Sequence, residues 1–253
     1  MNVMVVVWGA LMLVGLIGMI VCSKKKNNPA MQPVAIVLFL VVLGGAIMLL
    51  KEMDVFGGGN ASILNSEMRF AESRGVKAAK FVAGFAKGKK IVFIADKNYE
   101  QGELGKRVVA ALKEHCGGNL VLDYIAVPKG MEDNGVPVEE FMKAKDMDAL
   151  IAKHPDAAVI ITNIGLPQDA RRMKYFRTAA DKRPQLVLMN TGFTTNFDFV
   201  KALKKGDIAA VIVTAPKAKY DIKAPSDFDK AFDIRYVLVT KDNADQYKDQ
   251  LPR

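Results

Sequence analysis

Two long apolar runs open the sequence, and a short polar segment separates them. The first run covers residues 3–22 and the second covers residues 34–50. About 20 apolar residues span the hydrocarbon core of a bilayer as a helix, and about 17 are still enough. The pattern therefore predicts a transmembrane hairpin over residues 1–54, with one helix in each apolar run.

The charges between the two runs predict the orientation of the hairpin. Lys24, Lys25 and Lys26 are the only charged residues among the first fifty. Loops on the cytoplasmic side of a membrane are enriched in Lys and Arg, so this turn should stay inside the cell. We therefore expect a protein of the bacterial inner membrane whose soluble part lies outside the cytoplasm.

A flexible segment and a helix follow the hairpin. Residues 55–62 contain three consecutive glycines and are expected to form a linker. Residues 63–88 carry apolar residues at loose helical spacing among Arg and Lys, which predicts a juxtamembrane helix. Packing against the following domain is the default for such a helix, and lying on the membrane surface or acting as a stalk are the alternatives.

Short apolar runs rich in Val and Ile alternate with helical patterns over residues 89–253. These runs are nearly continuous in apolarity, which is typical of strands buried on both faces of a sheet. They lie at residues 91–95, 120–126, 157–162, 186–189, 208–213 and 236–239. The alternation predicts one soluble α/β domain, with a doubly wound and mostly parallel sheet of about six strands and helices on both faces.

Two of the predicted helices carry features that the structure can test. Residues 170–180 show amphipathic helical spacing and hold the densest basic cluster of the chain, Arg171, Arg172, Lys174 and Arg177. A solvated helix face explains this cluster best, and contact with phosphate or lipid headgroups is the alternative. Further on, Ser226 is expected to cap a short helix that contains Phe228 and Phe232.

Polar residues that follow the predicted strands make up the candidate binding site. In doubly wound sheets, ligands bind outside the carboxyl ends of the strands, where the strand order reverses. Short polar side chains there can hydrogen-bond a small polar ligand, but they equally suit ordinary turns. The candidate residues are Asp96, Asn98, Asn163, Asn190 and Thr191.

The sequence offers no complete catalytic constellation. It contains no G-x-G-x-x-G, no P-loop, no G-x-S-x-G and no zinc-ligand spacing. Its two histidines, His115 and His154, fall at the ends of predicted helices, where a cation is favoured electrostatically. Carboxylates such as Glu139 and Glu140 lie in stretches where solvation explains them. We therefore expect no catalysis, no cofactor and no metal.

The overall charge argues against a nucleic-acid partner. The chain has 36 Lys and Arg against 27 Asp and Glu, and the excess is spread along the sequence. Nucleic-acid binding proteins concentrate basic residues in a stripe and add aromatic residues for stacking. No such arrangement is visible, so no binding to nucleic acid is expected.

Residues 90 to about 192 resemble one lobe of the type I periplasmic binding proteins, in the group of amino-acid-binding receptors. The first feature of the resemblance is a strand that ends at Asp96 and is followed by Tyr99 and Gly102. Three later tracts also resemble the family: Phe141 with residues 150–152, residues 156–161, and residues 170–180. This resemblance implies an extracytoplasmic, receptor-like domain. The family closes two lobes over its ligand, whereas this chain has room for one.

The function that these observations favour is a membrane-anchored, extracytoplasmic binding or protein-interaction module. Its expected partners are the lipid bilayer, other envelope proteins or a second copy of itself within an envelope complex, and a weakly bound small polar ligand. The alternative is a flavodoxin-like enzyme or nucleotide-responsive membrane protein that faces the cytoplasm.

Overall fold

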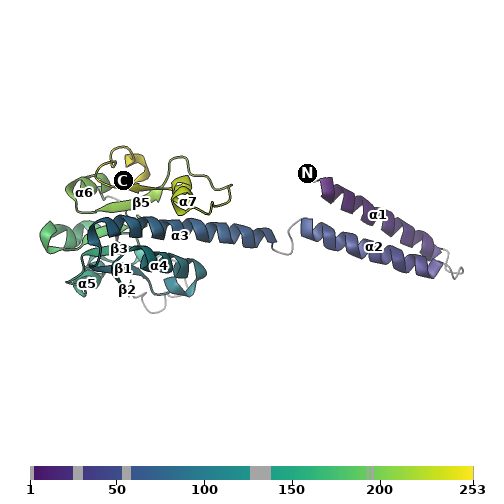
Figure 1. Ribbon diagram of the computed structural model, residues 1–253, viewed down its shortest axis with the longest axis horizontal. Helices are drawn as coiled ribbons and strands as arrows, with labels where there is room; N and C mark the ends of the chain where they lie inside the picture. Colours follow the sequence, from purple (N-terminus) through teal and green to yellow (C-terminus); the bar gives the residue numbers. More distant parts are fainter. Residues whose placement is uncertain are drawn as a thin grey trace. The chain divides into compact units, whose positions relative to one another are not determined.

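The computed structural model describes residues 3–24, 31–52, 58–125, 138–192, 194 and 197–252. The chain divides into two compact units, Met1–Asn65 and Ser66–Arg253, and each is described by itself. Unit 1 holds the apolar helices and unit 2 holds the sheet (Figure 1).

Unit 1 is built from α1 (Val3–Lys24) and α2 (Met31–Glu52), which pack on each other as an antiparallel pair (Figure 1). Glycines lie at their contact. A Cβ added to Gly15 would come within 2.5 Å of Cγ2 of Val42, and one added to Gly45 would come within 2.9 Å of Cγ of Met12. Small residues at such positions let two helices approach closely. By length and composition, both helices could cross a membrane.

The helix that follows begins earlier than the sequence pattern predicts. α3 covers Gly58–Ala86, so residues 58–62 are helical rather than part of a linker. A glycine weakens a helix by about 1 kcal/mol, which does not stop a helix of 29 residues from extending over its first turn. Residues 55–57 of the predicted linker and the turn with Lys25 and Lys26 lie outside the described residues.

Unit 2 contains a six-stranded sheet, as predicted, and each predicted run supplies one strand. The strand order is β2-β1-β3-β4-β5-β6. Neighbouring strands are parallel except β5 and β6, which are antiparallel, so the sheet is mostly parallel. The strands are β1 (Lys90–Asp96), β2 (Asn119–Ile125), β3 (Val159–Thr162), β4 (Gln185–Leu188), β5 (Ala210–Thr214) and β6 (Tyr236–Val239).

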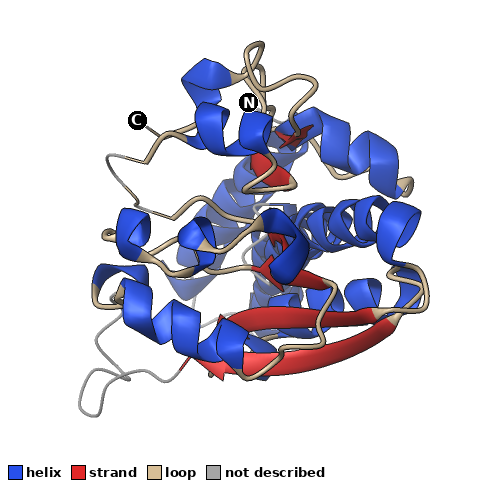
Figure 2. Cartoon of the chain, turned by 90° about the vertical axis from the view of Figure 1, so that its left-hand side faces the viewer, coloured by secondary structure: helices blue, strands red, loops and turns tan. Residues whose placement is uncertain are grey.

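Helices cover both faces of this sheet, which makes the fold doubly wound. One face carries α3, α4 (Glu103–His115) and α7 (Phe228–Arg235). The other carries α5 (Ala144–Ala152) and α6 (Phe199–Lys205), together with short 3₁₀ turns that lie beside α5. Figure 2 shows helices on both sides of the strands. Ile91 and Phe93 of β1 point to the first layer, and Val92 and Ile94 point to the second.

The last strand runs opposite to the others because α7 does not cross the sheet. α7 is eight residues long, and β6 begins directly after it. The amide N–H of Ala215 donates to the carbonyl of Arg235 at 2.8 Å, so the end of α7 is held beside the end of β5. The chain must then return in the opposite direction.

The N-terminal cap of α7 differs from the prediction, because the side chain of Asp227, and not that of Ser226, accepts the amide N–H of Lys230.

The amphipathic helix predicted at residues 170–180 is absent, and three 3₁₀ turns take its place. They cover Ala170–Arg172, Tyr175–Arg177 and Ala180–Lys182. The carboxylate of Asp148 accepts the amide N–H of Lys174 at 2.7 Å and that of Tyr175 at 3.1 Å. Met173 between the first two turns has an extended ψ of 133°. Contacts with α5 therefore override the local helical pattern.

Candidate functional site

All five predicted site residues lie at the carboxyl ends of the parallel strands in unit 2. We call this end of the sheet the carboxyl edge. Asp96 ends β1, Asn163 follows β3, and Asn190 and Thr191 follow β4 after one more residue. The strand order reverses between β1 and β3, so Asp96 and Asn163 flank the switch point of the sheet. The amide N–H of Asn163 donates to the carbonyl of Ile94 at 3.0 Å, which places it beside β1.

Three of these side chains form hydrogen bonds within their own turns. Oδ1 of Asp96 accepts the amide N–H of Asn98 at 3.0 Å, and Oδ1 of Asn98 accepts from Nε2 of Gln101 at 3.1 Å. Oδ1 of Asn190 accepts the amide N–H of Gly192 at 3.0 Å. Such bonds are what Asn and Asp contribute to turns. These contacts favour a turn role for Asp96, Asn98 and Asn190.

A carboxylate of the protein itself occupies part of this edge. Glu139 is 8% exposed, and its Oε1 accepts the amide N–H of Gly165 at 3.1 Å. Gly165 lies directly against Gly192, since a Cβ added to Gly165 would come within 2.2 Å of Cα of Gly192. A bound ligand could accept hydrogen bonds from backbone N–H groups at this edge. The amide N–H of Gly165 already donates to Glu139. The sequence pattern missed Glu139, because its neighbour Glu140 is exposed and the pair looks like a solvated stretch.

Three buried polar atoms in this region have no hydrogen-bond partner in the part of the chain that the structure describes. They are Oδ1 of Asn163, Oη of Tyr99 and Nε of Arg74. Burial raises the pKa of Tyr99 to about 12, while the charge of Arg74 opposes this rise and that of Asp96 adds to it. The guanidinium of Arg74 also lies 5.3 Å from the ring centroid of Tyr236. Unpaired buried polar atoms are costly, so a bonding partner such as a water molecule would stabilise each of these three atoms.

The histidines do not form a catalytic arrangement with the described residues. His115 ends α4, as expected. Nε2 of His154 lies 3.0 Å from Oδ2 of Asp123 and links β2 to the loop after α5. Burial raises the pKa of Asp123, but hydrogen bonds from His154 and the Tyr124 amide, together with nearby positive charge such as that of Lys153, hold that pKa below its usual value. Within the described ranges, no group of three His, Cys, Asp or Glu side chains could hold a metal ion.

Comparisons with known proteins give similar structures but no family. No protein-family model matches the sequence, and no curated protein matches it. AraP, an arabinose-binding protein from Geobacillus stearothermophilus, is 16% identical, over 70% of this chain and 63% of its own, with a TM-score of 0.42. A solute-binding protein from Burkholderia graminis, solved with D-arabinose, is 16% identical, over 70% of this chain and 61% of its own, with a TM-score of 0.44.

A sugar-binding protein from Bacillus halodurans is similar to the same extent, at 15% identity and a TM-score of 0.43, over 70% of this chain and 64% of its own. This chain thus spans about three fifths of the length of each of these proteins. All three are sugar-binding or solute-binding proteins, whereas the sequence resemblance is to the amino-acid-binding group of the type I periplasmic binding proteins. The fold of unit 2 follows from its own strand order and layers, and at these scores the similarity adds no ligand to it.

Proposed function

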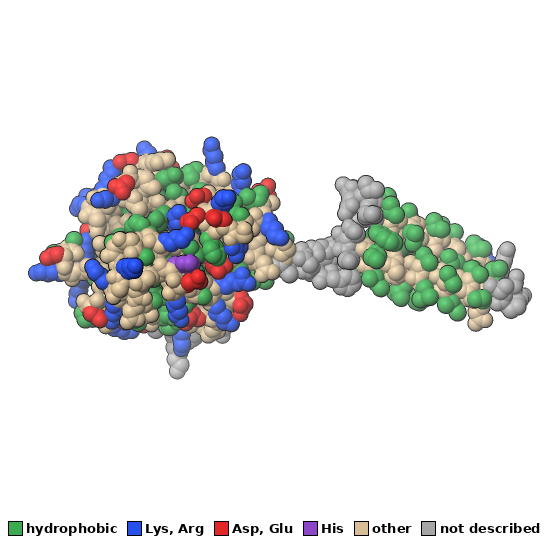
Figure 3. Space-filling view, in the orientation of Figure 1, with side chains coloured by type: hydrophobic (Ala, Val, Ile, Leu, Met, Phe, Trp, Pro, Cys, Tyr) green, Lys and Arg blue, Asp and Glu red, His purple; other side chains and the backbone are tan. Residues whose placement is uncertain are grey.

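We propose that the protein is a membrane-anchored binding module whose sheet-bearing unit lies outside the cytoplasm and carries out no catalysis. The observation that supports this most strongly is the surface of α1 and α2. Large apolar side chains there are left exposed, among them Leu13 at 62%, Val14 at 69% and Ile17 at 60%. Figure 3 shows these helices covered mostly by apolar side chains, whereas unit 2 carries a mixture of basic and acidic ones.

A bilayer is an environment that fits such a surface, which supports the membrane anchor. Soluble proteins rarely expose contiguous apolar patches of this extent, and the core helix of a soluble protein would be buried. A helix also forms its backbone hydrogen bonds within itself, which is necessary in a bilayer because lipid chains offer no hydrogen-bond partners. The Lys24–Lys26 triplet then favours a cytoplasmic turn and an extracytoplasmic unit 2.

Lys241→Cys should be labelled by a membrane-impermeant maleimide in intact spheroplasts, because Lys241 is exposed on unit 2. The unchanged protein is the matched control, since its two cysteines, Cys22 and Cys116, are both buried. Burial also raises the pKa of Cys116 to about 11, which keeps it from forming the reactive thiolate near neutral pH. Labelling of Lys241→Cys that appears only after the membrane is permeabilised would show that unit 2 faces the cytoplasm.

The ligand that this unit would bind is a small polar molecule at the carboxyl edge of the sheet. The unpaired atoms of Asn163, Tyr99 and Arg74 support this part of the proposal, because each could gain a hydrogen bond from a ligand. A single lobe encloses less of a ligand than two lobes do, so affinity should be weak, roughly micromolar to millimolar. Among the predicted site residues, Asn163 is supported best, because its buried side-chain oxygen has no partner among the described residues. Thr191 stays a candidate.

Asn163→Ala should abolish ligand binding and leave the melting temperature of unit 2 nearly unchanged, because the lost oxygen has no partner in the free protein. Asn190→Ala should instead cost about 1 kcal/mol of stability, since it removes the bond to the amide of Gly192. Calorimetric titration with D-arabinose and with L-glutamine, followed by thermal melts, separates these effects. If Asn163→Ala unfolds the protein, Asn163 is a turn residue and the carboxyl edge is no ligand site.

A further inference from the structure

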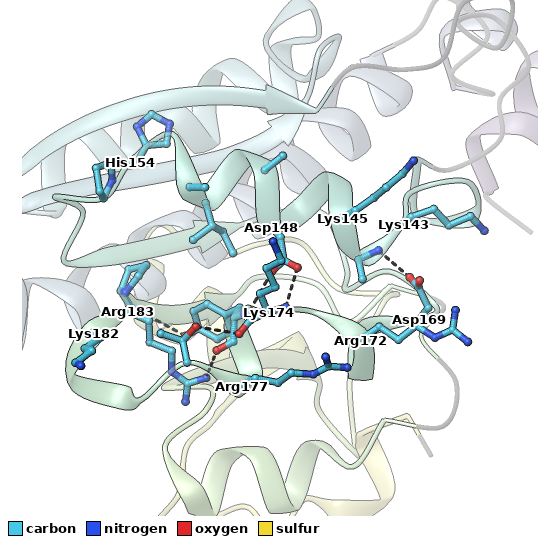
Figure 4. A pocket seen from close by; sticks show the side chains of 18 residues that line it. Lys143, Lys145, Asp148, His154, Asp169, Arg172, Lys174, Arg177, Lys182 and Arg183 are labelled. Atoms are coloured by element: carbon cyan, nitrogen blue, oxygen red, sulfur yellow. Dashed lines mark hydrogen bonds between the residues drawn. The ribbon is translucent and has the colours of Figure 1, made fainter.

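An open groove of about 750 Å³ runs along α5, on the face of the sheet that α5 and α6 cover. One wall is α5 and the other is the segment of 3₁₀ turns at residues 169–184 (Figure 4). Its volume lies within the range of ligand-binding clefts. The apolar part of its lining consists of Ala144, Ala149, Ile151, Ala152, Tyr175, Pro155 and Pro184.

The charges that line this groove are strongly biased towards the positive sign. Its lining includes seven Lys and Arg side chains but only two acidic ones, Asp148 and Asp169. Asp148 already accepts two backbone N–H groups, and Asp169 accepts the amide N–H of Ala144 at 2.7 Å. Neither carboxylate forms an ion pair with these lysines and arginines in the part of the chain that the structure describes.

Most of the cations in the groove lack a counter-ion. Arg183 is paired, because its Nη2 lies 2.5 Å from Oδ1 of Asp207. The other six form no ion pair with any residue in the described parts of the chain, and all six are exposed. They are Lys143, Lys145, Arg172, Lys174, Arg177 and Lys182. The groove thus combines apolar lining with free positive charge on both of its walls.

The spread of these cations excludes a single small anion as the ligand that fits them all. Lys143 and Lys145 lie at one end of the groove and Lys182 lies at the other (Figure 4). The nine residues of α5 alone span about 14 Å at 1.5 Å per residue. One phosphate cannot reach both ends, and a flat membrane surface cannot enter between two ridges. A chain with several negative charges can do both.

We propose that this groove binds an acidic segment of a partner polypeptide. Its apolar side chains would cover the lining formed by Ala149, Ala152 and Tyr175, and its carboxylates would meet the free lysines and arginines on the two walls. Complementary charge of this kind raises association rates and selects among partners. The site is separate from the carboxyl edge around Asn163, and it does not depend on the orientation of unit 2 in the membrane.

The test measures binding of a short fluorescein-labelled peptide rich in Glu and Leu to the full chain in phosphatidylcholine nanodiscs. Lys174→Glu with Arg177→Glu should weaken binding at least about tenfold in fluorescence anisotropy, as expected when two attractive contacts become repulsive. Lys113→Glu with Lys241→Glu is the matched control, because it changes the net charge equally at exposed positions outside the groove. The control should weaken binding less than about twofold.

A second variant tests the groove without changing its charge. Ala152 is exposed and lines the groove, so Ala152→Trp should fill it and weaken peptide binding to a similar extent. Thermal melts must show that each variant is folded, and Lys174→Gln with Arg177→Gln replaces the first variant if it is not. The proposal is overturned by absent peptide binding, by equal losses in the groove and control variants, or by unchanged binding in Ala152→Trp. Displacement of the peptide by equimolar glycerol 3-phosphate would also overturn it, because it would indicate a site for one phosphate.

Discussion

Arg235→Ala is expected to lower the free energy of unfolding of unit 2 by about 2–5 kcal/mol, because it removes a buried side chain and leaves a cavity. The arginine is 1% exposed, and its guanidinium lies 3.5 Å from the ring centroid of Phe70 and 4.9 Å from that of Tyr220. Its Nη1 and Nη2 donate to the two carboxylate oxygens of Glu67 at 2.5 and 2.7 Å, and its Nε donates to the carbonyl of Lys219 at 3.1 Å. The substitution removes all of these contacts and leaves a cavity between α3 and α7.

The effect of Arg235→Ala should also depend on pH. The hydrogen bond from Arg235 outweighs burial and holds the pKa of Glu67 below its ordinary value of 4.5. A carboxylate whose pKa is lowered on folding contributes stability above its unfolded pKa and loses it as the pH falls through its folded pKa. The difference in stability between the unchanged protein and Arg235→Ala should therefore shrink as the pH falls below about 4.5.

Urea unfolding of the full chain, followed by pulse proteolysis of unit 2, measures this stability. Lys204→Ala is the matched control, since Lys204 forms an ion pair with Asp245 in which both side chains are about half or more exposed. Exposed pairs of this kind contribute little, so the control should stay within about 1 kcal/mol of the unchanged protein. A loss below about 1 kcal/mol in Arg235→Ala would mean that the buried arginine does not hold α3 and α7 together.

Gly165→Ala is expected to destabilise unit 2 by about 3 kcal/mol or more, or to prevent folding. The added methyl group would lie 2.2 Å from Cα and 2.4 Å from the amide nitrogen of Gly192, and backbone atoms cannot move aside as a flexible side chain can. The loops after β3 and β4 would have to separate. This change would also displace Asn163 and the bond between Glu139 and Gly165, so ligand binding at the carboxyl edge should be lost with stability.

Gly84→Ala provides the control for a glycine that has free space around it. Nothing lies within 4 Å of a Cβ added to Gly84, which lies within α3. Alanine is a better helix former than glycine, so this change should be neutral or stabilise the protein by up to about 1 kcal/mol. The same urea and proteolysis measurement compares the two variants. Equal stabilities of Gly165→Ala and Gly84→Ala would show that the contact between Gly165 and Gly192 is not a tight one.

The candidate site illustrates how far the residue pattern reaches. The positions of Asp96, Asn163 and Asn190 at one edge of the sheet follow from the order of strands and helices, and they could be predicted. The sequence could not predict whether each of these side chains completes a turn or stays without a partner, because that depends on single hydrogen bonds in the folded chain. Arg74 and Glu139 could not be found either, since each reaches the carboxyl edge from a helix or turn that lies elsewhere in the sequence.

Hydrophobic periodicity by itself determined the two apolar helices of unit 1 and all six strands of unit 2, because burial of a strand or a helix shows within a short window of residues. Only the tertiary structure decided the direction of β6, the three turns in place of a helix at residues 170–180, and the basic groove beside α5. The ion pair of Arg235 joins residues that lie 168 positions apart in the chain. Asp148 likewise bonds the amide N–H of Lys174, which lies 26 residues later in the chain. Contacts over such separations leave no trace in local periodicity, since they depend on which polar groups the folded chain brings together.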